Sequence, residues 1–177
     1  MFFINTLRRN NLKKIQSLRE IKYVPLPKVK SISFIFDFQE EGILEAVKLL
    51  TTYALNHRIE YSGVSINLVN STFPQTIMNH HIKLLVKKEL NFLKTPKGEM
   101  IEKFLSDPSD LFIDLCPSYS YTFSYIAHKV NAKFKVGRYQ ENLNPYDLVI
   151  SSGKGPQTPA GYVKQVIHYL TTIKSEQ

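Results

Sequence analysis

Hydrophobic residues along the chain switch repeatedly between a strand pattern and a helix pattern. The run "VKSISFIFDF" is β-branched and aromatic, which is typical of a buried strand, and it ends near Asp37. The residues after it keep the periodicity of a helix that buries one face: Ile43, Val47, Leu50 and Ala54. Further strand patterns occur in "YSGVSINLV", "DLFIDLC", "AKFKVG" and "YDLVISS", with helical patterns between them and at the end of the chain. Because strands that alternate with helices pair in parallel through right-handed crossovers, we expect an α/β fold with one doubly wound, mostly parallel, Rossmann-like sheet.

The sequence marks the ends of some helices and strands clearly and leaves others undefined. Thr95 followed by Pro96, and Thr158 followed by Pro159, are typical of a helix N-cap followed by the first helical residue. The stretch from residue 70 to residue 88 fits a loop, a helix over "MNHHIKLLVKK", or both. The segment "ELNFLK" fits a short edge strand.

The first residues form a separate unit in this interpretation. The sequence predicts a basic amphipathic helix over residues 1–24, a linker over residues 25–30, and the α/β domain over residues 31–177. The helix should extend from residue 2 to about residue 22, with an apolar stripe made of Ile4, Leu7, Ile15 and Leu18. The segment "VPLPK" ends it because proline cannot continue a helix.

Charge distinguishes this segment from the rest of the chain. The 177 residues carry a net charge of +8. Eight lysines and arginines against one glutamate place +7 within residues 1–30, so the other 147 residues carry only +1. Such asymmetry is typical of a segment that meets an anionic partner. The candidate anion-binding residues are Arg8, Arg9, Lys13, Lys14, Arg19 and Lys22.

The basic helix has three interpretations at this stage. It binds RNA or the ribosome by neutralising phosphates, or it lies on an anionic membrane surface with its Phe2, Phe3, Ile4 and Leu7 end in the lipid interface. In the third, its apolar stripe packs on the body or on a second copy in a homodimer, and its charges are solvated.

A second candidate site follows from the sheet itself. In a doubly wound sheet, ligands bind beyond the carboxyl ends of the strands where the strand order reverses. We expect this point between the first strand and the "DLFIDLC" strand, which brings together Asp37, Gln39, Asp114, Ser118, Tyr119 and Ser120. The acids that follow the first strand should repel a free nucleotide. The hydroxyl residues can form an ordinary helix N-cap or an anion-binding site. Asp114 is expected to form a hydrogen bond with a neighbouring loop.

Other reactive residues give weaker signals. Cys116 is the only cysteine, which excludes an intramolecular disulfide and is typical of a reducing compartment; the residue is predicted to be buried and inert. The glycines around Lys154 do not match the P-loop spacing, and "NHH" lacks metal-ligand spacing. We predict no catalytic residue, cofactor or metal.

One stretch of the chain resembles a known enzyme family, and the whole chain resembles another group. Residues 110–138, "DLFIDLCPSYSYTFSYIAHKVNAKFKVGR", resemble a strand, helix and strand in the N-terminal half of heptosyltransferase-like GT-B glycosyltransferases. "FDFQEE", "TPKGEMIEKFLSDPSDLFI" and "NAKFKVG" resemble an uncharacterised Bacteroidota family known as a domain of unknown function. This second resemblance implies the α/β fold and a bacterial, cytoplasmic protein, and it implies no activity.

The sequence thus favours a non-enzymatic binding module that contacts RNA or the ribosome through its basic helix. One alternative is a transferase-like enzyme or ligand-binding domain that uses the strand ends near Asp37 and Ser118. Another is a peripheral protein of the inner membrane surface. No apolar run approaches the roughly 20 residues that cross a bilayer.

Overall fold

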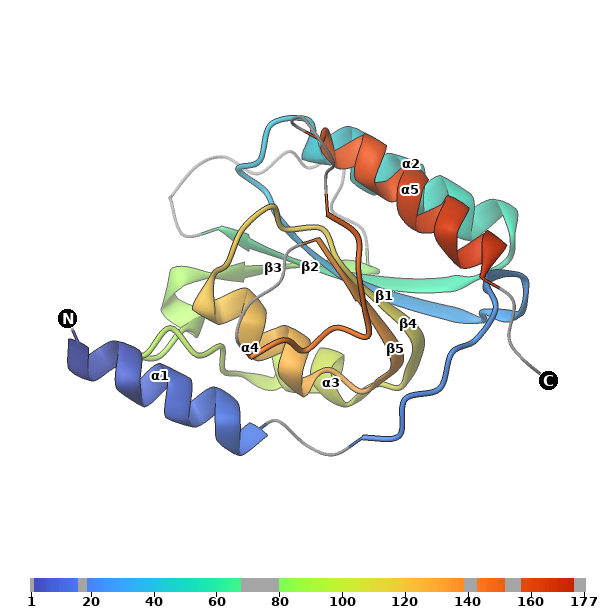
Figure 1. The fold of residues 1–177 in the computed structure, drawn as a ribbon. Helices are drawn as coiled ribbons and strands as arrows, with labels where there is room; N and C mark the ends of the chain where they lie inside the picture. The colour runs from blue at the N-terminus through green and yellow to red at the C-terminus, as the bar shows by residue number, and fades with distance from the viewer. Residues whose placement is uncertain (1, 16–18, 68–79, 139–142, 152–156, 174–177) are drawn as a thin grey trace.

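The computed structural model describes residues 2–15, 19–67, 80–138, 143–151 and 157–173, and it contains one six-stranded, all-parallel sheet (Figure 1). The strand order is β3-β2-β1-β4-β5-β6, so the order reverses between β1 and β4. This confirms the predicted doubly wound, Rossmann-like fold and the predicted point of reversal. The strands are β1 (Ser31–Asp37), β2 (Glu60–Asn67), β3 (Ile82–Val86), β4 (Ser109–Asp114), β5 (Ala132–Gly137) and β6 (Leu148–Val149).

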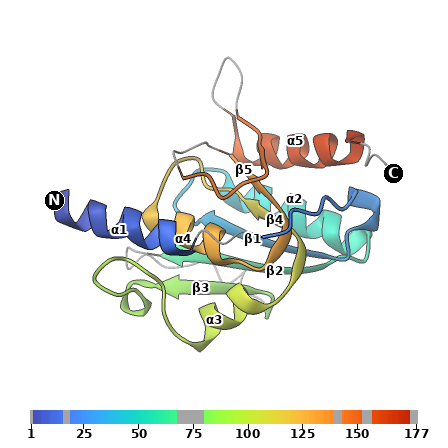
Figure 2. The same ribbon diagram turned by 60° about the horizontal axis from the view of Figure 1, so that its bottom comes forward.

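Helices cover both faces of the sheet (Figures 1 and 2). On one face, α2 (Ile43–Asn56) and α5 (Pro159–Thr172) lie side by side. On the other face lie α3 (Glu99–Ser106) and α4 (Tyr121–Lys129), with α1 (Phe2–Ile15) packed on the outside of α4. Short 3₁₀ helices occupy residues 26–28 and 87–89. None of the helices in the described part of the chain is long and apolar enough to cross a bilayer.

The two faces have separate hydrophobic cores because successive strand residues point to opposite sides. Phe34 and Phe36 belong to the core under α2 and α5, whereas Ile35 between them belongs to the core under α3 and α4. The same alternation in β4 places Ile113 in the first core and Phe112 in the second.

The position of α4 is fixed partly by a buried lysine. Lys135 on β5 is only 1% exposed, and its ammonium group donates hydrogen bonds to the carbonyls of Ala127 (2.7 Å) and His128 (3.1 Å). These carbonyls belong to the last turn of α4, where helices leave carbonyl groups without intrahelical partners. Burial lowers the pKa of Lys135 to about 7.

The basic segment folds differently from the prediction. Its helix ends at Ile15 rather than near residue 22, and residues 19–25 are not helical; residues 16–18, including Leu18 of the predicted stripe, lie outside the described part. Contacts with β5 and with the residue before β6 override the helical pattern: the backbone N–H of Lys22 donates to the carbonyl of Lys133 on β5 (3.1 Å), and Arg19 pairs with Asp147 before β6. Propensity is a weak determinant where such tertiary contacts compete.

Four local predictions have different outcomes. Thr158 caps α5 as expected, since its hydroxyl accepts a hydrogen bond from the Gly161 N–H (3.1 Å). The expected cap at Thr95 is wrong, because α3 begins only at Glu99 after Gly98, whose φ of 111° favours glycine. The stretch from residue 70 to residue 88 contains the edge strand β3. The edge strand predicted for "ELNFLK", residues 89–94, is wrong, because Leu90 forms only an isolated bridge with Pro96 and the residues after it turn.

Gly63 offers a test of the sheet register. It pairs with Phe34, and a Cβ atom at this position would lie 2.6 Å from the Phe34 ring. Because Phe34 is fully buried, Gly63→Ala should lower the free energy of unfolding by about 1–3 kcal/mol through overpacking. Urea denaturation measures this change, and Ser62→Ala on the same strand is the control. Equal stability of the two variants would contradict the register.

Candidate functional site

The carboxyl ends of β1 and β4 mark the point where the strand order reverses, and two different structures occupy its two sides. The side toward α2 and α5 is filled by side chains of the protein. The side toward α1 and α4 is an open cleft. The predicted ligand-binding residues are divided between these two sides.

An ion pair closes the first side. Arg138 follows β5 and pairs with Glu40 from the loop after β1, and both side chains are largely buried. The same guanidinium donates to the carbonyls of Leu115 and Gln157 and lies over the Tyr162 ring, 5.6 Å from its centroid. Burial raises the pKa of Glu40, and Arg138 offsets part of that effect. The mouth that the sequence placed beside the first strand is therefore occupied by Arg138.

Asp114, the last residue of β4, lies on the same sheet face as Phe112 and has a structural environment. It is fully buried and accepts hydrogen bonds from the Cys116 N–H (2.8 Å) and from the Tyr146 hydroxyl. The expected hydrogen bond to a neighbouring loop is thus confirmed. Burial raises the pKa of Asp114 to about 6. Burial also raises the pKa of Cys116 well above its ordinary value, so the thiol is not activated as a nucleophile.

Asp37 and Gln39 form the turn that follows β1. The Asp37 carboxylate accepts a hydrogen bond from the Gln39 N–H (2.9 Å), the pattern of an Asx turn. Neither residue lines the open cleft. Their ligand-binding role stays a prediction.

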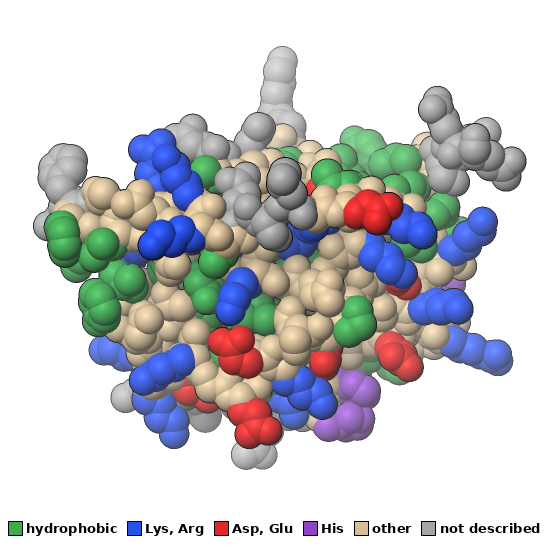
Figure 3. Space-filling view, turned by 90° about the horizontal axis from the view of Figure 1, so that it is seen from below, with side chains coloured by type: hydrophobic (Ala, Val, Ile, Leu, Met, Phe, Trp, Pro, Cys, Tyr) green, Lys and Arg blue, Asp and Glu red, His purple; other side chains and the backbone are tan. Residues whose placement is uncertain are grey.

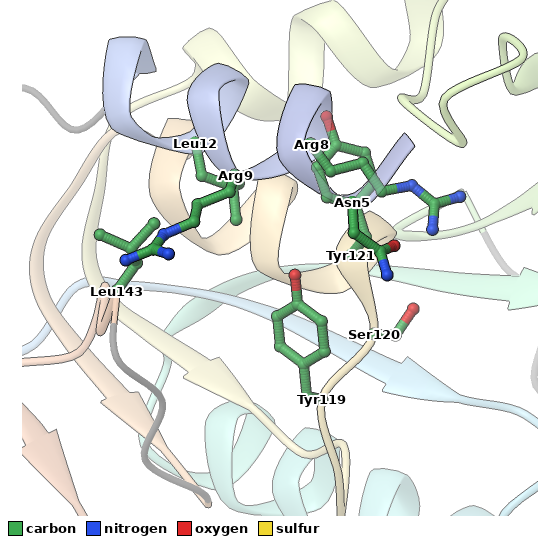
Figure 4. A pocket seen from close by; sticks show the side chains of 8 residues that line it. All are labelled: Asn5, Arg8, Arg9, Leu12, Tyr119, Ser120, Tyr121 and Leu143. Atoms are coloured by element: carbon green, nitrogen blue, oxygen red, sulfur yellow. The ribbon is translucent and has the colours of Figure 1, made fainter. Parts of the chain in front are cut away.

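The open cleft lies on the other side of the β4 end, between α1 and the loop that leads into α4 (Figure 4). Its volume is about 720 Å³. It brings together residues from both predicted sites, namely two arginines of the basic segment and two residues after β4. The lining consists of Asn5, Arg8, Arg9, Leu12, Tyr119, Ser120, Tyr121 and Leu143.

Tyr121 holds α1 in this position. Its ring lies under the Arg8 guanidinium, 5.1 Å from the ring centroid. Its hydroxyl accepts a hydrogen bond from the Asn11 amide (2.7 Å) and is 3.1 Å from the Thr95 hydroxyl. Arg8 also donates from Nε to the Leu93 carbonyl (2.9 Å). The Arg8 side chain is therefore fixed before any ligand arrives.

The described lining of the cleft is basic. Among the described residues, no carboxylate lines it, and none of Arg8, Arg9, Lys13 and Lys14 forms an ion pair. Arg19, by contrast, pairs with Asp147 and is not available to a partner in the same way. The N-terminal end of α4 adds a partial positive charge at Ser120.

The hydroxyl residues after β4 do not form the helix cap that was expected from the sequence. Ser120 occupies the N-cap position, but its side chain makes no capping hydrogen bond. The Thr122 hydroxyl instead donates to the Lys94 carbonyl (2.8 Å). Ser118 is exposed and does not line the cleft.

Sequence reasoning missed several residues that shape the site. Asn5 and Leu143 line the cleft, and Arg138 fills the side of the strand-order reversal that faces α2 and α5. Each of these residues comes from a distant part of the chain, and no sequence motif marks any of them. Residues 152–156, within the glycine-containing loop considered above, lie outside the described part. Among the described residues, no group of three His, Cys, Asp or Glu side chains is arranged to hold a metal ion.

Comparison with known proteins identifies the family of the chain. The model of a family of unknown function, DUF6913, matches residues 2–173. The chain belongs to this family. No curated protein and no solved structure matches it. The DUF6913 match assigns no activity to the chain. It supports neither the resemblance to glycosyltransferases nor a bacterial origin.

Asp114 makes stability depend on pH in a defined direction. Its pKa is raised from 3.8 to about 6, so the folded protein binds the proton more tightly than the unfolded chain. The stabilisation that proton binding by Asp114 gives to the folded state is complete below pH 3.8 and is lost as the pH rises through about 6. Over this window the loss is about 2–3 kcal/mol. In Asp114→Asn the free energy of unfolding should therefore fall less between these two pH values than in the wild type.

Urea titrations at a series of pH values measure this slope. Tyr146→Phe is the matched variant, because loss of the hydroxyl donor to Asp114 should raise the pKa of Asp114 further and steepen the slope. Identical slopes for the wild type and Asp114→Asn would refute the assignment.

Proposed function

We propose that this protein is a non-enzymatic binding module that holds RNA along α1 and the adjoining cleft, in the bacterial cytoplasm that its sequence resemblance implies. The observation that supports this proposal is the set of four α1 cations without a carboxylate partner among the described residues. Binding of such cations to phosphates releases condensed counterions, which drives association without base recognition.

The surface on both sides of α1 suits an extended polyanion. The cleft of about 720 Å³ lies on one side, and a shallower groove of about 490 Å³ lies on the other. The groove is lined by Leu7, Asn10, Asn11, Lys13, Lys14 and Leu93. In the part of the chain that the structure describes, both linings contain basic and amide side chains and no carboxylate. In the view from below, basic side chains lie beside hydrophobic ones in the left part of the surface, and most acidic ones lie further right (Figure 3).

The burial of α1 favours RNA over a membrane or a homodimer. An interfacial helix needs an apolar face that is free to enter lipid. Here Leu12 is 3% exposed and Leu7 is half-buried, so this face packs on the body of the same chain. Among the described residues at the start of α1, Phe3 (75% exposed) and Ile4 (39% exposed) are the large apolar side chains that remain accessible, and they do not form a continuous apolar face along the helix.

The ion pair between Arg138 and Glu40 weighs against the transferase-like alternative. A nucleotide-sugar in the mouth beside β1 would have to displace a guanidinium that contacts Glu40, Leu115 and Gln157. Breaking a buried pair of this kind costs about 3–5 kcal/mol. Binding at the open cleft requires no such displacement.

Neutralisation of α1 tests the proposal. The triple substitution Arg9→Gln, Lys13→Gln, Lys14→Gln removes three exposed charges that contact no carboxylate in the described residues. Fluorescence anisotropy with a labelled single-stranded RNA at several salt concentrations should show weaker binding. The slope of log K against log salt should fall by about 2, since each phosphate contact contributes about 0.7.

The matched control removes the same charge from the opposite face, with Lys28→Gln, Lys48→Gln and Lys164→Gln, which are all exposed. This variant should bind RNA as the wild type does. Equal losses in both triple variants would mean that net charge, and not α1, attracts RNA. Binding of anionic vesicles with no binding of RNA would contradict the proposal in favour of a membrane surface.

A further inference from the structure

We infer that the cleft between α1 and the start of α4 accepts one unstacked nucleotide of a single-stranded RNA, with its base against Tyr119 and its phosphate against Arg9. This inference rests on the proposed RNA-binding function and specifies the form of nucleic acid that the site takes. Three features of the cleft carry it: its size, its exposed aromatic side chain and its two arginines, of which Arg8 is held in place.

The dimensions of the cleft suit a nucleotide and exclude a duplex. A volume of about 720 Å³ falls within the range of about 300–1,000 Å³ that small-molecule sites occupy. A base that is paired and stacked in a duplex cannot enter such a space without leaving the helix. Single-stranded segments, in which bases can turn outward, are the usual targets of proteins that bind RNA through pockets.

Tyr119 supplies a surface for the base. Its side chain is 45% exposed, whereas Tyr121, two residues further along, is 5% exposed. The ring stands in the cleft below α1, with its hydroxyl directed toward the helix (Figure 4). Stacking of a base on an exposed aromatic ring contributes about 1–3 kcal/mol and tolerates any base.

The two arginines and Asn5 supply contacts to the phosphate and sugar. The Arg9 side chain extends from α1 toward Leu143, at one side of the cleft (Figure 4). Arg8 uses only its Nε donor within the described residues, in the bond to Leu93, so its terminal N–H groups can reach a phosphate. Since Tyr121 already holds the Arg8 guanidinium, little side-chain entropy is lost on binding.

The charge and the aromatic ring are separable in an experiment. Tyr119→Leu removes the stacking surface and leaves every charge, whereas Tyr119→Phe keeps the ring. We expect Tyr119→Leu to weaken binding of a short labelled single-stranded RNA by about 10-fold, the equivalent of about 1.4 kcal/mol. Tyr119→Phe should bind within about twofold of the wild type, and the same RNA annealed to its complement should bind more weakly than the single strand.

Inorganic polyphosphate serves as a polyanion without bases. It should compete less well than single-stranded RNA of equal charge against the wild type, and equally well against Tyr119→Leu. Circular dichroism and the thermal midpoint check that Tyr119→Leu is folded, as its partly exposed position suggests.

The outcomes distinguish this inference from the proposed function. If Tyr119→Leu binds RNA as tightly as the wild type, or if duplex and single strand bind equally, the nucleotide site is refuted while salt-dependent binding through α1 stands. If the wild type binds no RNA at all, both proposals fail.

Discussion

The packing of α1 on α4 determines which surface this molecule presents to a partner. Leu12 enters the core on that side of the sheet, and burial of one such side chain contributes about 1.5–3 kcal/mol. Tyr121 adds a hydrogen bond from Asn11 and a contact with Arg8. These contacts bury Leu12 and leave the Arg9, Lys13 and Lys14 side chains exposed. The basic segment is therefore part of the tertiary structure, and contacts within the protein hold the guanidinium groups of Arg8 and Arg19.

The same arrangement explains why the two sides of the strand-order reversal differ. Arg138 extends from the end of β5 to Glu40 and fills the side toward α5. On the other side, the loop after β4 turns into α4 below α1, and the cleft remains between them. A doubly wound sheet thus provides its usual ligand position, and in the described part of the chain the half beside the basic helix is the open one. Electropositive and aromatic side chains meet there because α1 is docked.

The sequence predicted the features that depend on local periodicity. The alternation of strands and helices sufficed for the sheet, and residue types sufficed for the cap at Thr158. Features that depend on distant contacts were missed or wrong. The helix was extended past Ile15 because nothing in the sequence shows that Arg19 pairs with Asp147. Arg9 and Tyr119 were assigned to two separate sites, since a helix near the N-terminus and a loop after β4 share no sequence signal.

Amide chemical-shift mapping tests the central claim most directly, because it reports where RNA contacts the protein. The labelled protein is titrated with a short single-stranded RNA at low salt, and the backbone amide of each residue is followed. We predict that Arg9 on α1 and Ser120 at the start of α4 shift together with the same apparent dissociation constant, because they border one cleft. Shifts confined to Lys13 and Lys14, with Ser120 unchanged, would contradict the account.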